Sequence, residues 1–214
     1  MDLKFIFRNN TLKEKFTNIF HNNSFLGPLS ISGPGSDLTQ TEFIRKEIPI
    51  LIKKYKVKSF MDAPCGDFFW MQYVTLDGIK YIGIDIVKEI IKNNKKKYKN
   101  TQRKFICKNI VSDTLPYADV ILIRDCWVHL SNKDIFLCIK NLKQNHIKYL
   151  LTTSFTNRNS NKDLDDIWRP INLERPPFNF PKPIEVIIEN CTEGDGIYSD
   201  KSLILWEISK LTFV

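Results

Sequence analysis

The sequence has 214 residues, of which 43% are hydrophobic and 26% are charged, and its formal net charge at pH 7 is +8. This balance is typical of a globular domain and excludes a wholly disordered chain. No apolar run approaches the roughly 20 residues that span a bilayer, and residues 1–10 lack the long apolar stretch of a secretory signal. We therefore expect one cytoplasmic domain over residues 1–214.

The first third of the chain contains two predicted helices and a turn. Apolar residues at helical spacing predict a helix around residues 11–20, and residues 32–36, SGPGS, predict a turn or flexible loop. Residues 39–42, TQTE, have the pattern of a capping box, which predicts the start of a helix that continues to Tyr55. We expect residues 1–36 to cover a core formed by residues 37–214.

The strongest local pattern lies at residues 58–70, KSFMDAPCGDFFW. A short apolar strand ends in Asp62, a tight turn contains Gly66, and an aromatic-rich helix is predicted to start at Asp67. A second apolar strand, residues 80–86, ends in an acid, Asp85, about 20 residues after Gly66. A strand, a glycine turn, a helix and a second strand that ends in an acid are typical of a mononucleotide-binding unit, in which the acid binds ribose hydroxyls.

The remaining elements continue an α/β pattern. A helix is predicted from Val87 to about Asn94, and three further strands are predicted at residues 104–110, 119–123 and 148–154. Two β-rich runs at the end, residues 184–188 and 202–208, have no helical pattern between them and predict an antiparallel hairpin.

Residues 62–67, DAPCGD, resemble the D-x-G-C-G-x-G motif of class I S-adenosylmethionine (SAM) dependent methyltransferases, although Pro64 and Phe68 stand where that motif has glycines. The resemblance implies an α/β, Rossmann-like, seven-stranded sheet, mostly parallel with an antiparallel C-terminal strand and with helices on both faces. It implies SAM as the cofactor and S-adenosylhomocysteine (SAH) as the product. The cofactor-binding residues that it suggests are Asp62, Ala63, Pro64, Cys65, Gly66, Asp67, Asp85, Ile86, Asn109, Ile110, Arg124 and Arg45.

The whole chain resembles a small bacterial and viral group of these methyltransferases that is associated with surface-glycan biosynthesis. The resemblance is carried by SGPGS, DAPCGDFFWM, RDCWVHLS, LLTTSF, WRPINL, PPF and CTEGDG. It implies methyl transfer to a small hydroxylated acceptor, a sugar or nucleotide-linked sugar. The loops that face the acceptor in this fold contain Trp168, Arg169, Asp195 and Tyr198, which we expect to bind it.

Asp125 and His129 follow the predicted strand 119–123, where side chains face the ligand crevice of such sheets. His129 is the preferred candidate for a catalytic base, because a histidine with an ordinary pKa loses its proton near neutrality. Asp125 is the second candidate, and Trp127 is expected to form a wall of the acceptor pocket. The structural alternatives are a packing role for His129, pairing with Arg124 or capping of the following helix for Asp125, and a core position for Trp127.

Two other functions are considered. The lysine-rich stretch at residues 88–104 suggests an RNA methyltransferase, but it lacks interleaved aromatics apart from Tyr98, so a solvated surface is favoured and nucleic acid is not expected as a partner. The second alternative function is a SAM- or nucleotide-binding module without catalysis. No metal is predicted, because the acids of residues 165–166 and 193–195 and the cysteines lack ligand spacing. We expect reduced cysteines at positions 65, 107, 126, 138 and 191.

Overall fold

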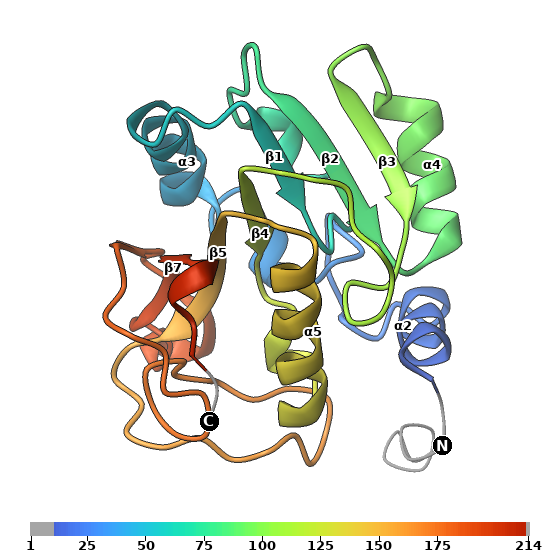
Figure 1. The fold of residues 1–214 in the computed structure, drawn as a ribbon. Coiled ribbons are helices and arrows are strands. Elements are labelled where there is room, and N and C mark those ends of the chain that lie inside the picture. Colours follow the sequence, from blue (N-terminus) through green and yellow to red (C-terminus); the bar gives the residue numbers. More distant parts are fainter. Residues whose placement is uncertain (1–10, 213–214) are drawn as a thin grey trace.

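The computed structural model describes residues 11–212, and its centre is a seven-stranded sheet (Figure 1). The strands lie in the order β3-β2-β1-β4-β5-β7-β6. Most of their residues are buried, because helices cover both faces of the sheet. The strands are β1 (Ser59–Asp62), β2 (Lys80–Asp85), β3 (Arg103–Cys107), β4 (Val120–Ile123), β5 (Tyr149–Phe155), β6 (Glu185–Ile188) and β7 (Lys201–Glu207).

The first five strands are parallel, and their order places a switch point between β1 and β4. From β1 the chain builds outward through β2 to β3 and then returns to the other side of β1, where Phe60 pairs with Val120. The predicted hairpin is confirmed: β6 and β7 are antiparallel, and β7 inserts between β5 and β6. The expected fold class is therefore confirmed. Ligands of such sheets bind at the carboxyl ends of the strands beside the switch point.

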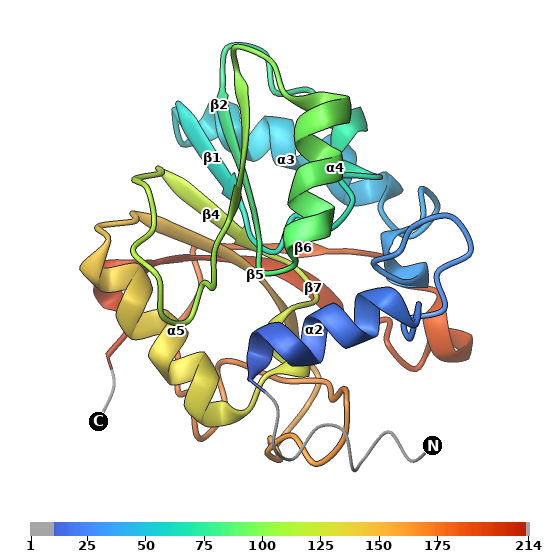
Figure 2. The same ribbon diagram turned by 90° about the vertical axis from the view of Figure 1, so that its right-hand side faces the viewer.

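The helices of the sheet are α3 (Glu42–Lys54) and α4 (Lys88–Tyr98) on one face and α5 (Asn132–Gln144) on the other. Each turns its apolar residues toward the sheet. Helix α2 (Leu12–His21) lies beyond the carboxyl ends of β2 and β3, as Figures 1 and 2 show. Within residues 11–212, no helix has both the length and the apolar character needed to cross a membrane.

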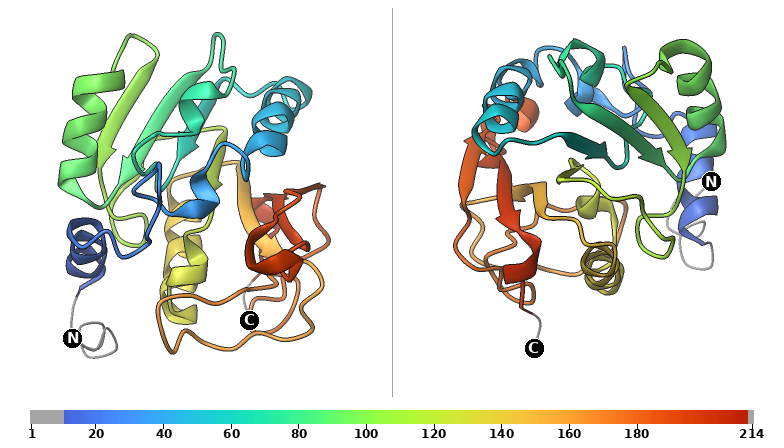
Figure 3. Two further views of the ribbon diagram at one scale, coloured as in Figure 1. Left: turned by 180° about the vertical axis from the view of Figure 1, so that it is seen from behind. Right: turned by 45° about the horizontal axis from the view of Figure 1, so that its top comes forward.

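Helix α2 confirms the helix expected near residues 11–20. Thr11 is its N-cap and forms a capping box with Glu14: the Thr11 amide donates to Glu14 Oε2 at 2.8 Å, and the Glu14 amide donates to Thr11 Oγ1 at 3.3 Å. The view from behind shows the chain running from α2 through residues 22–41 along this edge of the sheet to α3 (Figure 3).

The helix predicted at Asp67 does not form, and a short 3-10 turn at Met71–Tyr73 follows instead. Gly66 and Phe68 have left-handed backbones, with φ of +49° and +61°, and such residues interrupt a right-handed helix. The Phe68 conformation buries its ring against Tyr81 and Phe105, at centroid distances of 5.0 and 5.4 Å. The turn is thus shaped by core packing of Phe68, which stands where the methyltransferase motif has a glycine.

The capping box predicted at residues 39–42 is also wrong. Helix α3 begins at Glu42 with Thr41 as N-cap, and no side chain caps it. The buried Thr41 hydroxyl donates to the Asp37 carbonyl at 2.9 Å and is therefore turned away from the helix amides. Helix α4 is longer than predicted and reaches Tyr98, whose ring packs on Phe68 at 5.0 Å.

Candidate functional site

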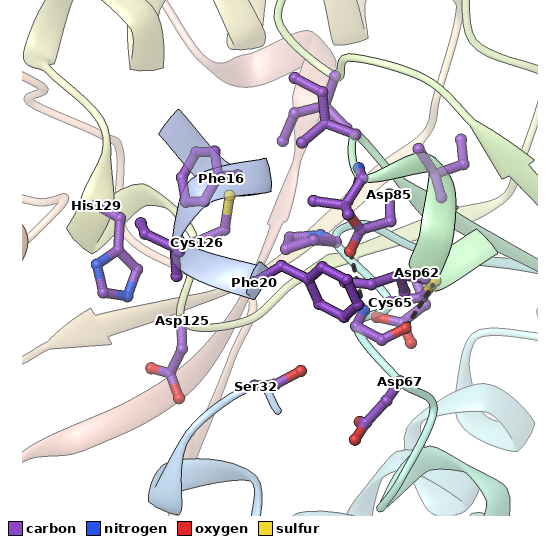
Figure 4. Close-up of a pocket in the computed structure, with 18 of the residues that line it drawn as sticks. Phe16, Phe20, Ser32, Asp62, Cys65, Asp67, Asp85, Asp125, Cys126 and His129 are labelled. Atoms are coloured by element: carbon purple, nitrogen blue, oxygen red, sulfur yellow. Dashed lines mark hydrogen bonds between the residues drawn. The ribbon is translucent and has the colours of Figure 1, made fainter. Parts of the chain in front are cut away.

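A cavity opens at the carboxyl ends of β1, β2 and β4, beside the switch point (Figure 4). Its floor is formed by the residues that follow these strands, and helix α2 and residues 25–36 close it from the other side. The wall from α2 is apolar, with Leu12, Phe16, Ile19 and Phe20, whereas the strand ends contribute polar and charged groups. The cavity therefore combines an apolar cover with an acidic floor.

The glycine turn is held from both sides of its backbone. The Gly66 amide donates to Asp85 Oδ2 at 3.2 Å, and the Gly66 carbonyl accepts from Asn94 Nδ2 at 2.7 Å. The other Asp85 oxygen accepts from the Val87 amide at 2.8 Å. Asn94 was not predicted as a site residue; its only signal was a polar side chain on the buried face of an amphipathic helix. The turn and the Asp85 carboxylate are thus preorganised relative to each other.

Asp62 and Asp85 are both buried at the cavity floor. Burial raises the pKa of Asp62 to about 7. The hydrogen bond of 2.7 Å that Asp62 Oδ2 accepts from the Tyr81 hydroxyl acts in the opposite direction and lowers the pKa. Burial likewise raises the pKa of Asp85 to about 6, although the hydrogen bonds from the Val87 and Gly66 amides lower it. Within residues 11–212 neither carboxyl group forms an ion pair, although the charge of Arg124 acts on Asp62, so the two groups are suited to a ligand that brings an ammonium group and hydroxyl donors.

The chain turns at the end of β4 through a cluster of buried ions. Arg124 donates to both oxygens of Glu189, with 2.7 Å between Nη2 and Oε2, and its Nη1 lies 3.2 Å from Asp125 Oδ2. The same Asp125 oxygen accepts from Lys201 Nζ at 2.7 Å. Glu189 and Lys201 were not predicted, since nothing in a β-rich hairpin marks a partner that lies 65 or more residues away.

Asp125 is a poor candidate for a base in this arrangement. Burial raises the pKa of its carboxyl group, but the positive charges of Lys201 and Arg124 outweigh burial and hold the pKa below its usual value. Its backbone is left-handed, with φ of +50°, which is uncommon for a residue other than glycine. The carboxylate lines the cavity as a permanent anion and hydrogen-bond acceptor.

His129 lies at the cavity wall on the same side as Asp125 (Figure 4). Its Nδ1 is 2.5 Å from the Ile167 carbonyl, which can only accept, so Nδ1 carries the proton and Nε2 the lone pair of the neutral ring. The Phe25 ring packs on it at 4.8 Å. The expectation of an ordinary pKa is wrong, because burial lowers the pKa of His129 to about 4. The ring is therefore neutral near pH 7.

Most of the predicted cofactor residues line this cavity, and two do not. Ala63 is buried behind the turn, and Arg45 donates to the Leu38 carbonyl at 2.9 Å, outside the cavity lining. Asn109 lines the cavity, although its Oδ1 already accepts from the Val111 amide at 2.9 Å. The predicted residues in the lining are Asp62, Pro64, Cys65, Gly66, Asp67, Asp85, Ile86, Asn109, Ile110 and Arg124.

The residues predicted to bind the acceptor all lie outside the cavity lining. Trp168 and Tyr198 come together, with ring centroids 5.1 Å apart, and both remain half-buried. Trp127 is buried in the core against Phe180, which is the structural alternative considered for it. Arg169 is buried.

Arg169 connects three segments by donating to the Lys162 carbonyl at 2.8 Å, to Asn132 Oδ1 at 2.8 Å and to the Val128 carbonyl at 3.3 Å. Asp195 is exposed in a turn between β6 and β7. Across residues 11–212, no three His, Cys, Asp or Glu side chains gather in a way that would hold a metal ion. Four of the five cysteines are buried and none forms a disulfide with another described cysteine.

No protein-family model and no curated protein matches the sequence. Solved structures do match the fold. Human N-acetylserotonin methyltransferase, in complex with SAM, is 12% identical with a TM-score of 0.61, and the match covers 92% of this chain and 59% of that chain. The chain thus spans less than two thirds of the human enzyme. It shares a Rossmann-like methyltransferase fold.

Two further structures support that conclusion. A SAM-dependent methyltransferase of Leishmania major is 14% identical with a TM-score of 0.65, over 96% of this chain and 87% of that chain. The 1,6-didemethyltoxoflavin-N1-methyltransferase of Burkholderia thailandensis, with bound SAH, is 11% identical with a TM-score of 0.61, over 92% and 86% of the two chains. Enzymes with different acceptors therefore share this fold, and the acceptor must be argued from the site.

Proposed function

We propose that this protein is a SAM-dependent methyltransferase that acts on a hydroxyl group of a small acceptor, a sugar or nucleotide-linked sugar in glycan biosynthesis. The observation that carries the cofactor assignment is the Asp85 carboxylate, which the amides of Gly66 and Val87 fix at the cavity floor. A fixed carboxylate at the end of the second strand is suited to the vicinal hydroxyls of a ribose.

The other groups of the cavity fit the rest of SAM. The buried Asp62 carboxyl group would hold the ammonium group, and the ion pair would favour its ionised form. Asn109 and Ile110 follow β3 and would hold the adenine, with the Asn109 side chain as hydrogen-bonding partner. When bound, SAM supplies an electrophilic methyl group. The apolar wall from α2 would exclude water from the reacting atoms.

The acceptor is proposed to bind in the cavity beside His129 and Asp125. The Asp125 carboxylate would accept a hydrogen bond from an acceptor hydroxyl and orient it. The Trp168–Tyr198 pair lies outside the cavity lining. His129 Nε2, which has the lone pair, would take the proton from the hydroxyl that is methylated. The glycan context is supported by the sequence resemblance.

The RNA alternative receives no support from the site. The lysines of residues 88–104 are mostly exposed, and none of them lines the cavity. A non-catalytic binding module remains the simplest competing function.

The test is to titrate the purified protein with SAH by calorimetry, and then to incubate it with methyl-labelled SAM and a panel of sugars, nucleotide sugars, glycans and RNA. We expect SAH binding and label transfer to a sugar-containing acceptor. Absence of SAH binding would overturn the cofactor assignment, and label in RNA alone would overturn the acceptor class.

A further inference from the structure

The two edges of the sheet differ in the side chains that they present to solvent. The β3 edge begins with Arg103 and Lys104, and the Lys104 side chain is exposed. The β6 edge instead presents Ile184, Val186 and Ile188, which are 39%, 47% and 51% exposed. Proteins usually protect an exposed edge strand with charged side chains, particularly lysine, because an apolar edge pairs readily with another chain. The β3 edge is therefore protected, whereas the β6 edge is suited to a partner.

The main chain of β6 is also available for pairing. The Glu189 amide donates to the Lys201 carbonyl at 3.0 Å, so Glu189 directs its main-chain groups toward the β7 side of the antiparallel ladder. Successive residues of such a strand direct these groups alternately toward and away from the neighbouring strand. Val186 and Ile188 therefore direct their amide and carbonyl groups away from β7. The edge offers hydrogen-bonding groups as well as apolar side chains.

Helix α3 extends the apolar surface on the other side of this edge. Phe43 and Ile50 are 39% and 59% exposed, and they lie on one stripe of the helix because two turns separate them. Lys54, one turn further along this stripe, forms an ion pair with Glu185 of β6. The right-hand view of Figure 3 shows α3 beside the C-terminal hairpin. Apolar side chains therefore flank the β6 edge on both faces of the sheet.

The sequence of β6 is complementary to itself. If Val186 pairs with Val186 of a second copy across a two-fold axis, Ile184 lies opposite Ile188 of that copy. Residues at alternate positions of a strand point to the same face, so these three side chains and their counterparts form one continuous apolar strip. The main-chain groups that Val186 directs away from β7 then face those of its counterpart.

Polar side chains disfavour the neighbouring register. A register centred on Ile187 would place Ile184 opposite Asn190 of the copy and would break the apolar strip. It would also place Glu185 opposite Glu189 of the copy, and like charges directly opposite each other are destabilising. In the register centred on the preceding residue, Glu185 lies opposite the apolar side chain of Ile187. The charges therefore select a single arrangement of two copies.

We propose that this protein forms a two-fold symmetric dimer in which the β6 strands of two copies pair antiparallel, with Val186 facing its own counterpart. The two seven-stranded sheets then join into one continuous sheet. The pairing holds the hairpin that supplies Glu189 and Lys201 to the buried ion cluster. The inference is independent of the proposed cofactor and acceptor.

Sedimentation velocity over a range of protein concentrations tests the dimer. We expect the wild type to sediment as a dimer. Val186→Lys and Val186→Glu each remove apolar contacts and place two like charges opposite each other, so each should weaken the dimer at least about 10-fold. Because residue 186 faces its own counterpart, an equimolar mixture of the two variants should restore the dimer. Leu137→Lys, at an exposed position of α5, is the matched control and should leave the dimer unchanged.

The outcomes decide between this dimer and other partners. Thermal unfolding verifies that each variant folds, which is expected because the Val186 side chain is exposed. A wild type that sediments as a monomer over the whole concentration range would overturn the inference and would leave β6 to an extended segment of a different protein. A dimer that persists in both Val186 variants would place the interface elsewhere. A dimer that is lost in both variants and is not restored by mixing them would overturn the two-fold register.

Discussion

Lys201, the first residue of β7, donates a hydrogen bond of 2.7 Å to the Asp125 carboxylate at the end of β4. The two side chains tie the C-terminal hairpin to the edge of the sheet where the cavity opens. Glu189 lies behind them, 3.8 Å from the same ammonium group. The hairpin thus contributes to the electrostatics of the site although it provides none of the strand-end motifs.

The ion cluster leads to a stability prediction. Lys201→Met removes a buried positive charge and leaves the negative charges of Asp125 and Glu189 only partly compensated. We therefore expect the free energy of unfolding to fall by about 3–5 kcal/mol. Lys210→Met is the matched control: Lys210 pairs with Glu207 at 3.2 Å but its side chain is 67% exposed, and exposed pairs contribute less than about 1 kcal/mol. Urea unfolding measures both. Equal losses in the two variants would contradict a structural role for the cluster.

The sequence was sufficient to predict the sheet and its hairpin because most strands are short, largely apolar runs with a clear boundary. Asp62 and Asp85 were predicted for the same reason: they end two such strands, and parallel strands bring their carboxyl ends to one edge. These features depend on local pattern together with one topological rule.

The sequence did not predict contacts that depend on the path of a loop. The turn does not continue as a helix because the Phe68 ring packs against Tyr81 on β2 and Phe105 on β3. Arg169 was predicted to bind the acceptor, but its guanidinium donates its hydrogen bonds to main-chain carbonyls and to Asn132. Residue type and loop position cannot distinguish these two uses of arginine.

The cofactor assignment gives a second prediction, on Asp85. Asp85→Ala removes the acceptor for ribose hydroxyls and the partner of the Gly66 amide, so SAH affinity should fall by about 1.5–3 kcal/mol, the contribution of a hydrogen bond to a charged group. Titration calorimetry measures this loss. Asp77→Ala changes an exposed aspartate outside the cavity and should leave SAH affinity unchanged. An unaltered affinity in Asp85→Ala would place the ribose elsewhere.

A third prediction concerns Asp62 and pH. Its pKa is raised from 3.8 to about 7 by burial, so the folded state holds a proton that the unfolded chain releases between these pH values. The contribution of Asp62 to the free energy of unfolding without ligand should therefore decrease as pH rises from 4 to 8. At about 1.4 kcal/mol per pKa unit, the contribution is of the order of 4 kcal/mol.

Asp62→Asn isolates this contribution, because the amide keeps an oxygen for the Tyr81 hydroxyl but does not ionise. Relative to the wild type, the variant should gain stability steadily between pH 4 and pH 8 in urea unfolding experiments. Parallel pH profiles for the two proteins would show that Asp62 titrates normally in the folded state.

The lysine-rich face of α4 gives a fourth prediction. Lys95, Lys96 and Lys97 are exposed and lie outside the cavity lining, so replacing all three with alanine should leave SAH affinity and methyl transfer unchanged. Filter binding of RNA at several salt concentrations provides the decisive comparison. A steep salt dependence in the wild type that disappears in the triple variant would favour an RNA acceptor.

The last prediction concerns the catalytic base. His129→Ala removes the Nε2 lone pair that would take the proton from the acceptor hydroxyl, and because the lowered pKa makes His129 a weak base, kcat should fall by about 10²-fold, the low end of the usual contribution of a positioned base. SAH affinity should stay within about twofold. His21→Ala is the matched control, because the His21 side chain is 53% exposed and lies outside the cavity lining.

The pH profile adds a second measurement for the same residue. Because burial lowers the pKa of His129 to about 4, the ring stays neutral above about pH 5, and its protonation should produce no acid limb in kcat between pH 6 and pH 8. Labelled-SAM assays with the acceptor found in the panel measure both quantities. Loss of SAH binding in His129→Ala would identify His129 as a cofactor residue. An unchanged kcat would leave orientation of the hydroxyl by Asp125 as the source of the rate, since methyl transfer to a well-aligned acceptor depends mainly on positioning.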